Sequence, residues 1–433
     1  MRPKPCRTRR VAEAVGRIWF GVRGWAWLLC RILPMKAMSI ATIFSALSGF
    51  IVIFVATLAL DGPIFEQFNA YWGLFFAVAG LIDGLMQETT RAVSSPHPRG
   101  TARPHVAALF LGGAIGLLAI VCGPLLLPRI VDERPVTASA LLTVGIVCYA
   151  YQAALSGILS GLKLWNHYAV LLILDSGIRL VLVLIALAAG WGLTSFLIVT
   201  VIGAISWAII IGCSPRARHG LLTSLADVSS RRFMRRVGAA MLASGASAAL
   251  ITGFPAMMKF TGDAGTLAGL MLAITLTRAP ILVPLQRFQS ALIVYFVEKR
   301  GSPIKPILAV IGVGLIGAVA AYLIGPWILS TFFSPDYYVS GWILAVLTFA
   351  AAWMGALIIT GTRTLAAEQH RLYVLGWIVA SVSAFAVLLL PLATTAAVLA
   401  ALTVGPALGI LVHLGGYKAE PQRSAEQQGV DKR

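Results

Sequence analysis

The chemically capable residues of this chain are charged and amide side chains that interrupt long apolar runs. An ionisable side chain in hydrocarbon costs at least about 2.5–3.5 kcal/mol, so those present usually face a cavity or a partner. The densest group lies in the apolar run 264–294 and contains Arg278, Gln286, Arg287 and Gln289. Arginine presents a planar fork of donors that matches phosphate oxygens, and it stays charged at cellular pH. The arginines therefore offer donors suited to phosphate oxygens, although in an ideal helix Arg278 and Gln289 share a face while Arg287 points the opposite way.

Two prolines in the same run bear on that interpretation. Pro280 and Pro284 leave backbone carbonyls unpaired and bend the helix, which is tolerable at this depth only against other protein or a wet cavity. Arg278 has no acidic residue within helical reach in its own run, so it either lines a cavity or pairs with an acid of another helix. Arg287 lies near the inner end of the run, where anchoring at the membrane interface is the alternative to a site.

The run 66–88 ends in a polar helical face. Asp83, Gln87 and Arg91 follow one another at intervals of four residues, with Glu88 beside them. The interpretation open for Asp83 and Gln87 is a place on the wall of a cavity. For Arg91 the alternative is an interfacial anchor whose side chain extends to the membrane surface.

Two further apolar runs contain charged positions. Asp175 and Arg179, four residues apart near the bilayer middle, have the order that favours an intrahelical ion pair. The pair is either structural or a proton- or ion-responsive switch. Asp175, Asp83 and Glu88 are the candidates for coupling an ion. Lys259 lies at the outer end of its run, against the usual distribution of positive charge, where it would face the exit of a cavity.

The elements that position these residues are membrane-spanning helices. The chain has 433 residues, of which 59% are hydrophobic and only 12% charged, a composition outside that of soluble globular proteins. At about 20 residues per span, the apolar residues supply on the order of twelve spans and leave no room for a large domain outside the membrane. The five cysteines lack metal-binding spacing, and no nucleotide-binding loop occurs. We therefore expect no enzymatic activity, no metal and no cofactor.

Twelve apolar runs have the length of a membrane-spanning helix. They lie near residues 36–60, 66–88, 105–128, 137–160, 165–189, 193–213, 234–258, 264–294, 305–330, 338–361, 372–391 and 393–415. The longest polar interruption, the basic linker 214–233, divides them into 36–213 and 234–415, with six runs each. Because six is even, both halves enter the membrane from the same side, which predicts parallel repeats related by an axis along the membrane normal.

The net charge of +18 is explained by a membrane and not by a nucleic-acid partner. If the N-terminus is inside, most of the 34 Lys and Arg residues fall on the inner side, and the outer loops hold Arg129, Arg134 and Lys259. This bias predicts a multi-pass protein of the bacterial inner (plasma) membrane with cytoplasmic N- and C-termini. Residues 1–35 form either a basic amphipathic helix on anionic inner-leaflet lipids or a disordered cytoplasmic extension, and 416–433 form a polar cytoplasmic tail.

Four segments carry a resemblance to a known family: Ser45–Phe50 (SALSGF), Gln87–Ser94 (QETTRAVS), Thr277–Gln289 (TRAPILVPLQRFQ) and Gly361–His370 (GTRTLAAEQH). With these segments, the chain resembles the polysaccharide transporters that flip lipid-linked oligosaccharides, a branch of the multidrug/oligosaccharidyl-lipid/polysaccharide (MOP) exporter superfamily. The resemblance extends over nearly the whole chain from about residue 36. The long N-terminal extension is a departure from the family pattern.

The resemblance implies an all-α polytopic protein of MATE-like fold, with two pseudo-symmetric six-helix bundles around a central cationic cavity. It further implies secondary-type transport by alternating access. The transported molecule would be a lipid-linked oligo- or polysaccharide precursor, moved from the inner to the outer leaflet for cell-envelope or exopolysaccharide biosynthesis.

The resemblance also implies roles for particular residues. Arg91, Arg278 and Arg287 would contact the anionic headgroup, and Lys259 would lie at the outer mouth. Hydrogen-bond partners of the sugar or phosphate would be Gln87, Gln286 and Gln289. The expected partners are a lipid-pyrophosphate-linked glycan, anionic inner-leaflet lipids, and glycosyltransferases or a polymerase of the same pathway.

Two other functions stay open. A MATE-type drug or cation antiporter on the same fold should present unpaired acids in its cavity, whereas the unpaired charge in the run 264–294 is positive. A membrane glycan polymerase or ligase would need clusters of acid, base or arginine in sizeable outer loops, and the sequence offers none. A non-transporting scaffold is the remaining alternative.

Overall fold

The computed structural model describes residues 37–95, 100–261, 267–299, 302–367 and 369–417. Within these ranges the regular elements are all helices, joined by short connections, so the prediction of an all-α polytopic fold is confirmed. The predicted extension 1–35 and nearly all of the tail 416–433 lie outside the described residues.

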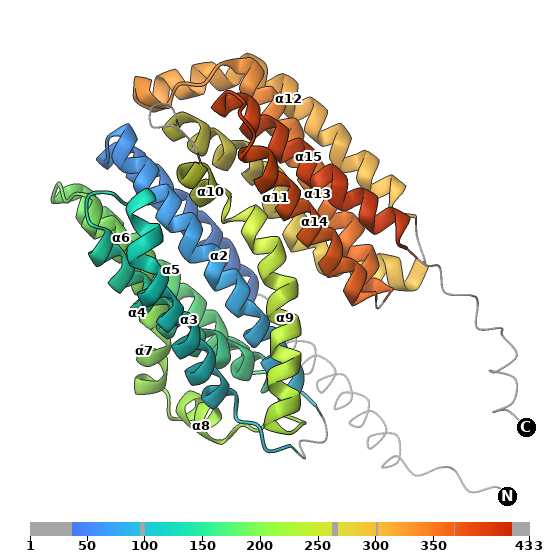
Figure 1. The fold of residues 1–433 in the computed structure, drawn as a ribbon. Coiled ribbons are helices and arrows are strands. Elements are labelled where there is room, and N and C mark those ends of the chain that lie inside the picture. Colours follow the sequence, from blue (N-terminus) through green and yellow to red (C-terminus); the bar gives the residue numbers. More distant parts are fainter. Residues whose placement is uncertain (1–36, 96–99, 262–266, 300–301, 368, 418–433) are drawn as a thin grey trace, which may run out of the picture.

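The helices form two groups on either side of a central plane (Figure 1). The first group consists of an opening helix Ala37–Ala59, α2 Gly62–Val93, α3 Pro104–Leu126, α4 Pro135–Gly161, α5 Trp165–Ala188, α6 Leu193–Ile202 and α7 Ser206–Cys213. The second group consists of α9 Ser230–Ile251, α10 Phe254–Thr261, α11 Leu267–Lys299, α12 Ile304–Phe332, α13 Gly341–Ala366, α14 His370–Leu388 and α15 Thr394–Gly415. A short helix, α8 (Pro215–Thr223), lies between them in the chain.

The number of spans differs slightly from the twelve expected. Among the described residues, ten helices are long and apolar enough to cross a membrane alone, and α9 with α10 form an eleventh as a pair bent by 62°. The bend lies at Thr252 and Gly253, just before Pro255, which explains why an uninterrupted apolar run became two helices. Helix α11 contributes a further, shorter apolar stretch, Leu267–Leu282, at the start of its 33 residues. The chain is therefore a multi-pass membrane protein.

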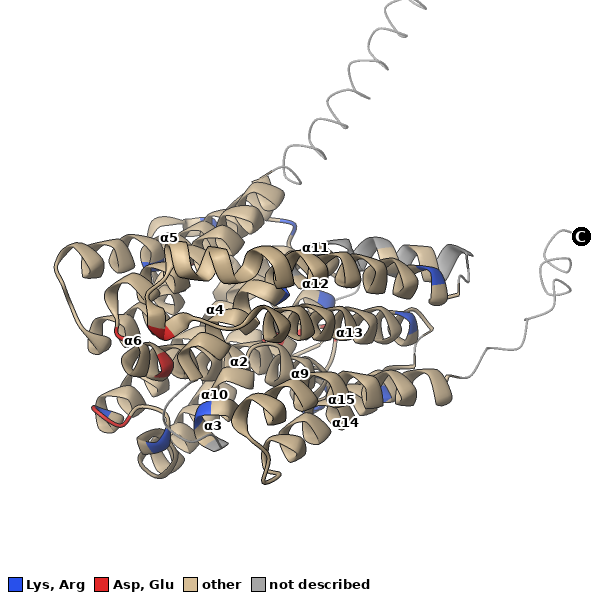
Figure 2. Ribbon diagram, turned by 90° about the horizontal axis from the view of Figure 1, so that it is seen from above, with Lys and Arg blue, Asp and Glu red and all other residues tan. Residues whose placement is uncertain are grey.

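Few charged residues interrupt these helices, as Figure 2 shows. Large apolar side chains face outward instead, for example Leu125 of α3 and Ile316 of α12, which are 76% and 74% exposed. Such exposure is unfavourable in water but is expected where lipid tails cover the surface.

Helix α2 is the element that connects the two groups. It packs on α4 and α6 within its own group and on α9, α10 and α11 of the other (Figure 1). Its contact with α9 depends on small residues, since a Cβ atom added at Gly84 would overlap the backbone of Met241, and one added at Gly80 would overlap Ala248. Small residues let helix backbones approach closely in a membrane. The position of α2 therefore determines how the groups meet.

Candidate functional site

A cavity of about 370 Å³ lies between the two groups of helices. The opening helix, α2 and α5 form one wall, and α9, α10, α11 and the bend between α9 and α10 form the other. Its polar lining residues are Ser45, Ser48, Asn69, Asp175, Ser176, Arg179, Thr252, Thr275 and Arg278. The cavity thus combines charged, amide and hydroxyl groups contributed by both groups of helices.

Arg278 of α11 is the cation on the second wall. Its side chain is buried, and its Nη1 donates a hydrogen bond of 3.2 Å to the carbonyl oxygen of Ile251. Ile251 is the last residue of α9, so its carbonyl has no partner further along that helix. The guanidinium also lies 5.5 Å from the ring centroid of Phe254. Among the described residues no acid pairs with Arg278, so its charge is not neutralised locally.

The first wall carries a charged pair that is neutral overall. Arg179 and Asp175 of α5 form an ion pair of 2.6 Å, which confirms the predicted intrahelical pair. Arg179 also donates from Nε to the carbonyl of Thr200 and lies 5.1 Å from the ring of Phe76. Gly203 makes this arrangement possible, because a Cβ atom there would collide with both members of the pair. The described lining residues therefore carry one net positive charge, that of Arg278.

Several polar atoms of the cavity have no hydrogen-bond partner among the described residues. They are Ser48 Oγ, Asn69 Nδ2, Asp175 Oδ1 and Arg179 Nη2. Buried polar groups are almost always hydrogen-bonded, so unsatisfied ones lining a cavity indicate water or a ligand. Beside Asn69, the rings of Trp72 and Phe76 lie with their centroids 4.6 Å apart. Aromatic rings next to amide and hydroxyl groups provide the mixed surface that a sugar ring requires.

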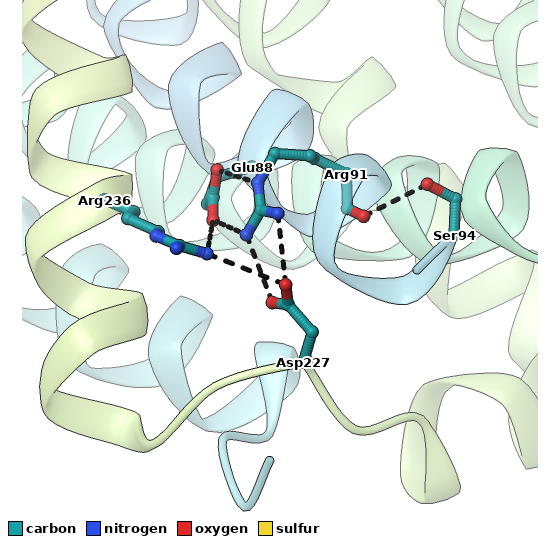
Figure 3. Close-up of polar contacts among 5 residues, drawn as sticks. All are labelled: Glu88, Arg91, Ser94, Asp227 and Arg236. Carbon is teal, nitrogen blue, oxygen red and sulfur yellow. Dashed lines mark hydrogen bonds and ion pairs between the residues drawn. The ribbon is translucent and has the colours of Figure 1, made fainter. Parts of the chain in front are cut away.

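At one end of α2, four charged side chains form an ion cluster, defined here as Glu88, Arg91, Asp227 and Arg236 (Figure 3). Arg91 lies 2.5 Å from Glu88 and 3.1 Å from Asp227, and Arg236 lies 3.6 Å from Asp227 and 3.9 Å from Glu88. The cluster therefore joins α2 to the loop before α9 and to α9 itself. We call this end of the molecule the basic end.

The electrostatics of the ion cluster favour the ionised form of Asp227. Burial alone raises the pKa of the Asp227 carboxyl, but the hydrogen bonds from Arg91 and the positive charges of Arg91 and Arg236 outweigh that effect. The pKa of Asp227 is consequently lowered from its ordinary value. Two backbone hydrogen bonds between Ala102 and the segment Ala226–Val228 hold the loop of Asp227 against the start of α3.

At the opposite end of α2, Glu66 makes a second connection between the groups. Its carboxylate pairs with Lys259 of α10 at 3.1 Å. It also accepts hydrogen bonds from the backbone N–H groups of Leu267 and Ala268, at 3.0 and 2.9 Å, where α11 begins. A carboxylate at a helix N-terminus is stabilised by the dipole of that helix. The cavity lies between this connection and the ion cluster.

The structure brings together only part of the predicted set of site residues. Among the described residues of that set, Arg278 and Asp175 line the cavity. Arg91 and Glu88 belong to the ion cluster, and Lys259 pairs with Glu66. Asp83 accepts a hydrogen bond of 2.8 Å from Tyr149 of α4, inside the first group, and Gln87 is exposed. The side chains of Gln286, Arg287 and Gln289 lie outside the described residues.

Sequence reasoning missed Glu66, Asn69 and Asp227. A signal for the first two is present, because Glu66, Asn69, Gly73 and Phe76 recur every three or four residues along one face of α2. For Asp227 the signal is that it is the sole acid of the basic linker 214–233. An isolated acid in a basic segment suggests a specific cationic partner.

Comparisons with known proteins show what the chain resembles. No protein-family model matches it. It is 38% identical over 390 residues to the uncharacterized protein Rv3630 of Mycobacterium tuberculosis, covering 86% of this chain and 89% of that protein.

Two solved structures share the fold at low sequence identity. One is a multidrug resistance MATE family transporter of the MOP superfamily in an inward-facing conformation, with a TM-score of 0.64 and 15% identity over 87% of this chain and 94% of that one. The other is the lipid II flippase MurJ in an inward closed conformation, with a TM-score of 0.64 and 14% identity over 90% of this chain and 88% of that one. These likenesses show that the chain has the MATE-like fold.

Proposed function

The chain belongs to the family that includes the mycobacterial protein Rv3630, and from this membership and its MATE-like fold we propose that it is a secondary transporter of a lipid-linked saccharide. In this proposal it moves the anionic headgroup of a lipid-linked oligo- or polysaccharide precursor from the inner to the outer leaflet of the plasma membrane. The lipid tail stays in the bilayer while the headgroup passes through the central cavity.

The observation that carries the proposal is the uncompensated charge of Arg278 on the cavity wall. A cation buried without an acidic partner is costly, and an anionic ligand would offset that cost. Among the described residues its guanidinium makes one hydrogen bond, to the carbonyl of Ile251, so other donors are left for phosphate oxygens. A cavity built for cationic drugs should instead present an unpaired acid, whereas Asp175 is paired with Arg179.

The size and lining of the cavity fit the phosphate of the headgroup and the sugar ring next to it. A volume of about 370 Å³ lies at the small end of the range of about 300–1,000 Å³ usual for small-molecule sites. The unsatisfied atoms of Ser48 and Asn69, beside Trp72 and Phe76, supply hydrogen bonds and an apolar surface for a sugar ring next to the phosphate.

The two connections at the ends of α2 support alternating access. A headgroup that enters from the basic end must pass the ion cluster, and one that leaves at the other end must pass Glu66 and Lys259. We propose that the basic end is cytoplasmic, in accord with the excess of Lys and Arg there. No nucleotide-binding motif occurs in the sequence, so the driving force is an ion gradient, the membrane potential or the gradient of the substrate itself.

Charge reversal at Arg278 tests the proposal. Protein reconstituted in vesicles is supplied with a fluorescent lipid-linked oligosaccharide on one leaflet, and its arrival on the other is measured with an impermeant reductant. We expect Arg278→Glu to abolish movement of the anionic lipid and to spare any transport of a lipophilic cation. Arg363→Glu, the same change in α13 outside the cavity, is the matched control and should transport normally. Normal flipping by Arg278→Glu would contradict the proposal.

A further inference from the structure

A second hollow, of about 730 Å³, lies at the basic end and has no lining residue in common with the central cavity. It is formed by the last turn of α2, the connection between α4 and α5, and α8 with the residues that follow it. Its lining is of two kinds. Arg216, His219 and Thr223 of α8 supply polar groups, and Val93, Leu162 and Leu164 supply an apolar floor.

The position of α8 over this hollow is fixed by packing. Ala217 and Leu221 are buried in a cluster with Ile158 and other residues of the basic end of α4. Gly220 lies close to α4, since a Cβ atom there would come within 3.2 Å of Leu162. Ser214 caps the helix by accepting a hydrogen bond from the backbone N–H of Ala217. A helix held by one face presents its other faces in a defined direction.

The face of α8 that lines the hollow is the one with Arg216, His219 and Thr223, which are spaced by three and four residues and so lie on one side of the helix. Arg216 and Arg218 are both exposed, and the described residues supply no ion pair to either. The sole acid of this linker, Asp227, is already held in the ion cluster. Among the described residues, the positive charge of Arg216 therefore has no acidic partner, and it lies beside the apolar floor of the hollow.

The hollow also lies where a membrane surface is expected. α4 ends at Gly161 and α5 begins at Trp165, so the floor of the hollow is at the ends of two membrane-spanning helices. Leu162 is 43% exposed and Trp165 is 37% exposed at this level. Tryptophan is enriched at the membrane–water interface, where an apolar ring and a polar tip are both accommodated.

We propose that this hollow binds an anionic glycerophospholipid of the leaflet at the basic end. The headgroup phosphate lies against Arg216 and His219, and the glycerol and first methylenes lie on Leu162 and Leu164. Arginine forms charge-assisted hydrogen bonds with phosphate oxygens, and basic pockets at the ends of spans attract anionic headgroups. The site is separate from the proposed path of the transported lipid, so it stands whether or not the proposed function is correct.

The lipid in this hollow contacts both segments that the ion cluster joins. Val93 lies two residues after Arg91, and Leu225, which also lines the hollow, lies two residues before Asp227. An occupant therefore packs against the end of α2 and the loop before α9 together.

Two arginines of α8 provide a matched pair of variants. Arg216→Gln and Arg218→Gln remove the same charge from one turn of the same helix, but the two side chains lie on different faces and only Arg216 lines the hollow. Purified full-length protein is titrated with phosphatidylglycerol or phosphatidylcholine, and bound lipid is counted by native mass spectrometry. We expect preferential binding of phosphatidylglycerol, weakened about fivefold by Arg216→Gln and unchanged by Arg218→Gln.

A third variant and a competition complete the test. Thr223→Trp fills the hollow without changing charge, so we expect it to reduce phosphatidylglycerol binding as well. Inorganic phosphate in large excess should not displace the lipid, because it makes no use of the apolar floor. The proposal is overturned by equal effects of the two arginine variants, by equal binding of the two lipids, by unchanged binding in Thr223→Trp, or by displacement with phosphate alone.

Discussion

The guanidinium of Arg278 and the carbonyl of Ile251 are joined by a hydrogen bond of 3.2 Å that links α11 to the broken end of α9. The carbonyl is available because α9 stops at Ile251 and α10 begins at Phe254. A positive charge near a helix C-terminus is favourable, since the unpaired carbonyls there carry partial negative charge. One side chain thus stabilises the break in a membrane helix and faces the cavity.

Conservative replacement of Arg278 separates its charge from its geometry. Arg278→Lys keeps a positive charge but replaces a fork of donors with a single ammonium group. We expect it to transport an anionic lipid about tenfold more slowly, and Arg278→Gln to lose more, because hydrogen bonds to charged groups contribute about 1.5–3 kcal/mol. Initial flipping rates in reconstituted vesicles measure the loss of transport in each variant. Arg363→Lys is the control, and wild-type rates for Arg278→Gln would refute the role of the charge.

Removing the charge of Asp227 should open the basic end. In Asp227→Asn, Arg91 and Arg236 lose one of the two carboxylates that hold them, so the conformation in which α2 and α9 are joined becomes less favourable. Arg91 and Arg236 are 46% and 40% exposed in their side chains, so the effect is modest, about fivefold in the population of open molecules.

Spin labels on the two helices detect this opening. Labels at Ser94 and Arg235, on a background without the five native cysteines, report the distance between the ends of α2 and α9 by electron spin resonance. The control is Asp132→Asn, an exposed acid outside the ion cluster. An identical distance distribution in Asp227→Asn and the wild type would show that the ion cluster does not hold this end closed.

The ion cluster should respond to acid only at low pH. A carboxyl whose pKa is lowered by folding contributes stability above its ordinary pKa, and that contribution is lost as the pH falls through the lowered value. For Asp227, which faces Arg91 and Arg236 with Glu88 as the second carboxylate, the label distance should stay constant between about pH 8 and pH 5 and change below about pH 4. In Asp227→Asn the acid-induced change should be smaller. A transition near neutral pH would contradict this assignment.

The pair of Glu66 and Lys259 should be important for stability. Glu66→Gln leaves Lys259 buried without a counterion and weakens the hydrogen bonds at the start of α11. Breaking one partner of a buried pair typically costs about 3–5 kcal/mol, whereas replacing both with apolar groups costs much less. We expect Glu66→Gln to lower the Tm in detergent and the double variant Glu66→Gln with Lys259→Met to recover most of the loss, because the amide oxygen still accepts hydrogen bonds and no unpaired cation remains. A double variant as unstable as the single one would argue against the pairing.

A comparison of single and double variants also decides whether the pair of Asp175 and Arg179 is structural or a switch. If the pair is structural, Asp175→Asn destabilises the protein, and Asp175→Leu with Arg179→Met restores both stability and transport. If the pair is a switch that responds to protons or ions, the double variant is stable but does not transport. Thermal unfolding and flipping rates, measured on the same preparations, distinguish the two outcomes.

Local patterns in the sequence were sufficient to predict the helices and one ion pair. The apolar runs correspond to helices because a backbone in lipid must satisfy its hydrogen bonds within its own segment. Asp175 and Arg179 were predictable because partners four residues apart are fixed by helix geometry alone. Arg278 was singled out because it lacks an acid within that reach, and the described structure supplies none from elsewhere.

Contacts between distant segments could not be predicted in this way. Arg91 pairs with Asp227, which is 136 residues further along the chain, and Lys259 pairs with Glu66 across 193 residues. Such pairs depend on how α2 packs against α9 and α10, and that packing is not encoded in the spacing of any one helix. The bend at Thr252 and Gly253 was missed for a related reason, because the apolar run continues through it without a charged residue that marks an end.

The two-residue interruption between α9 and α10 has a mechanical consequence. A continuous helix resists bending because its backbone hydrogen bonds must stretch. Helices α9 and α10, joined by Thr252 and Gly253, can reorient by rotation about a few backbone dihedral angles. Arg278 donates a hydrogen bond to Ile251, the last residue of α9, on one side of this hinge. In the proposed function, an anionic headgroup that attracts this guanidinium away from Ile251 would remove the contact between α11 and the end of α9, which would couple binding of the headgroup to movement at the hinge.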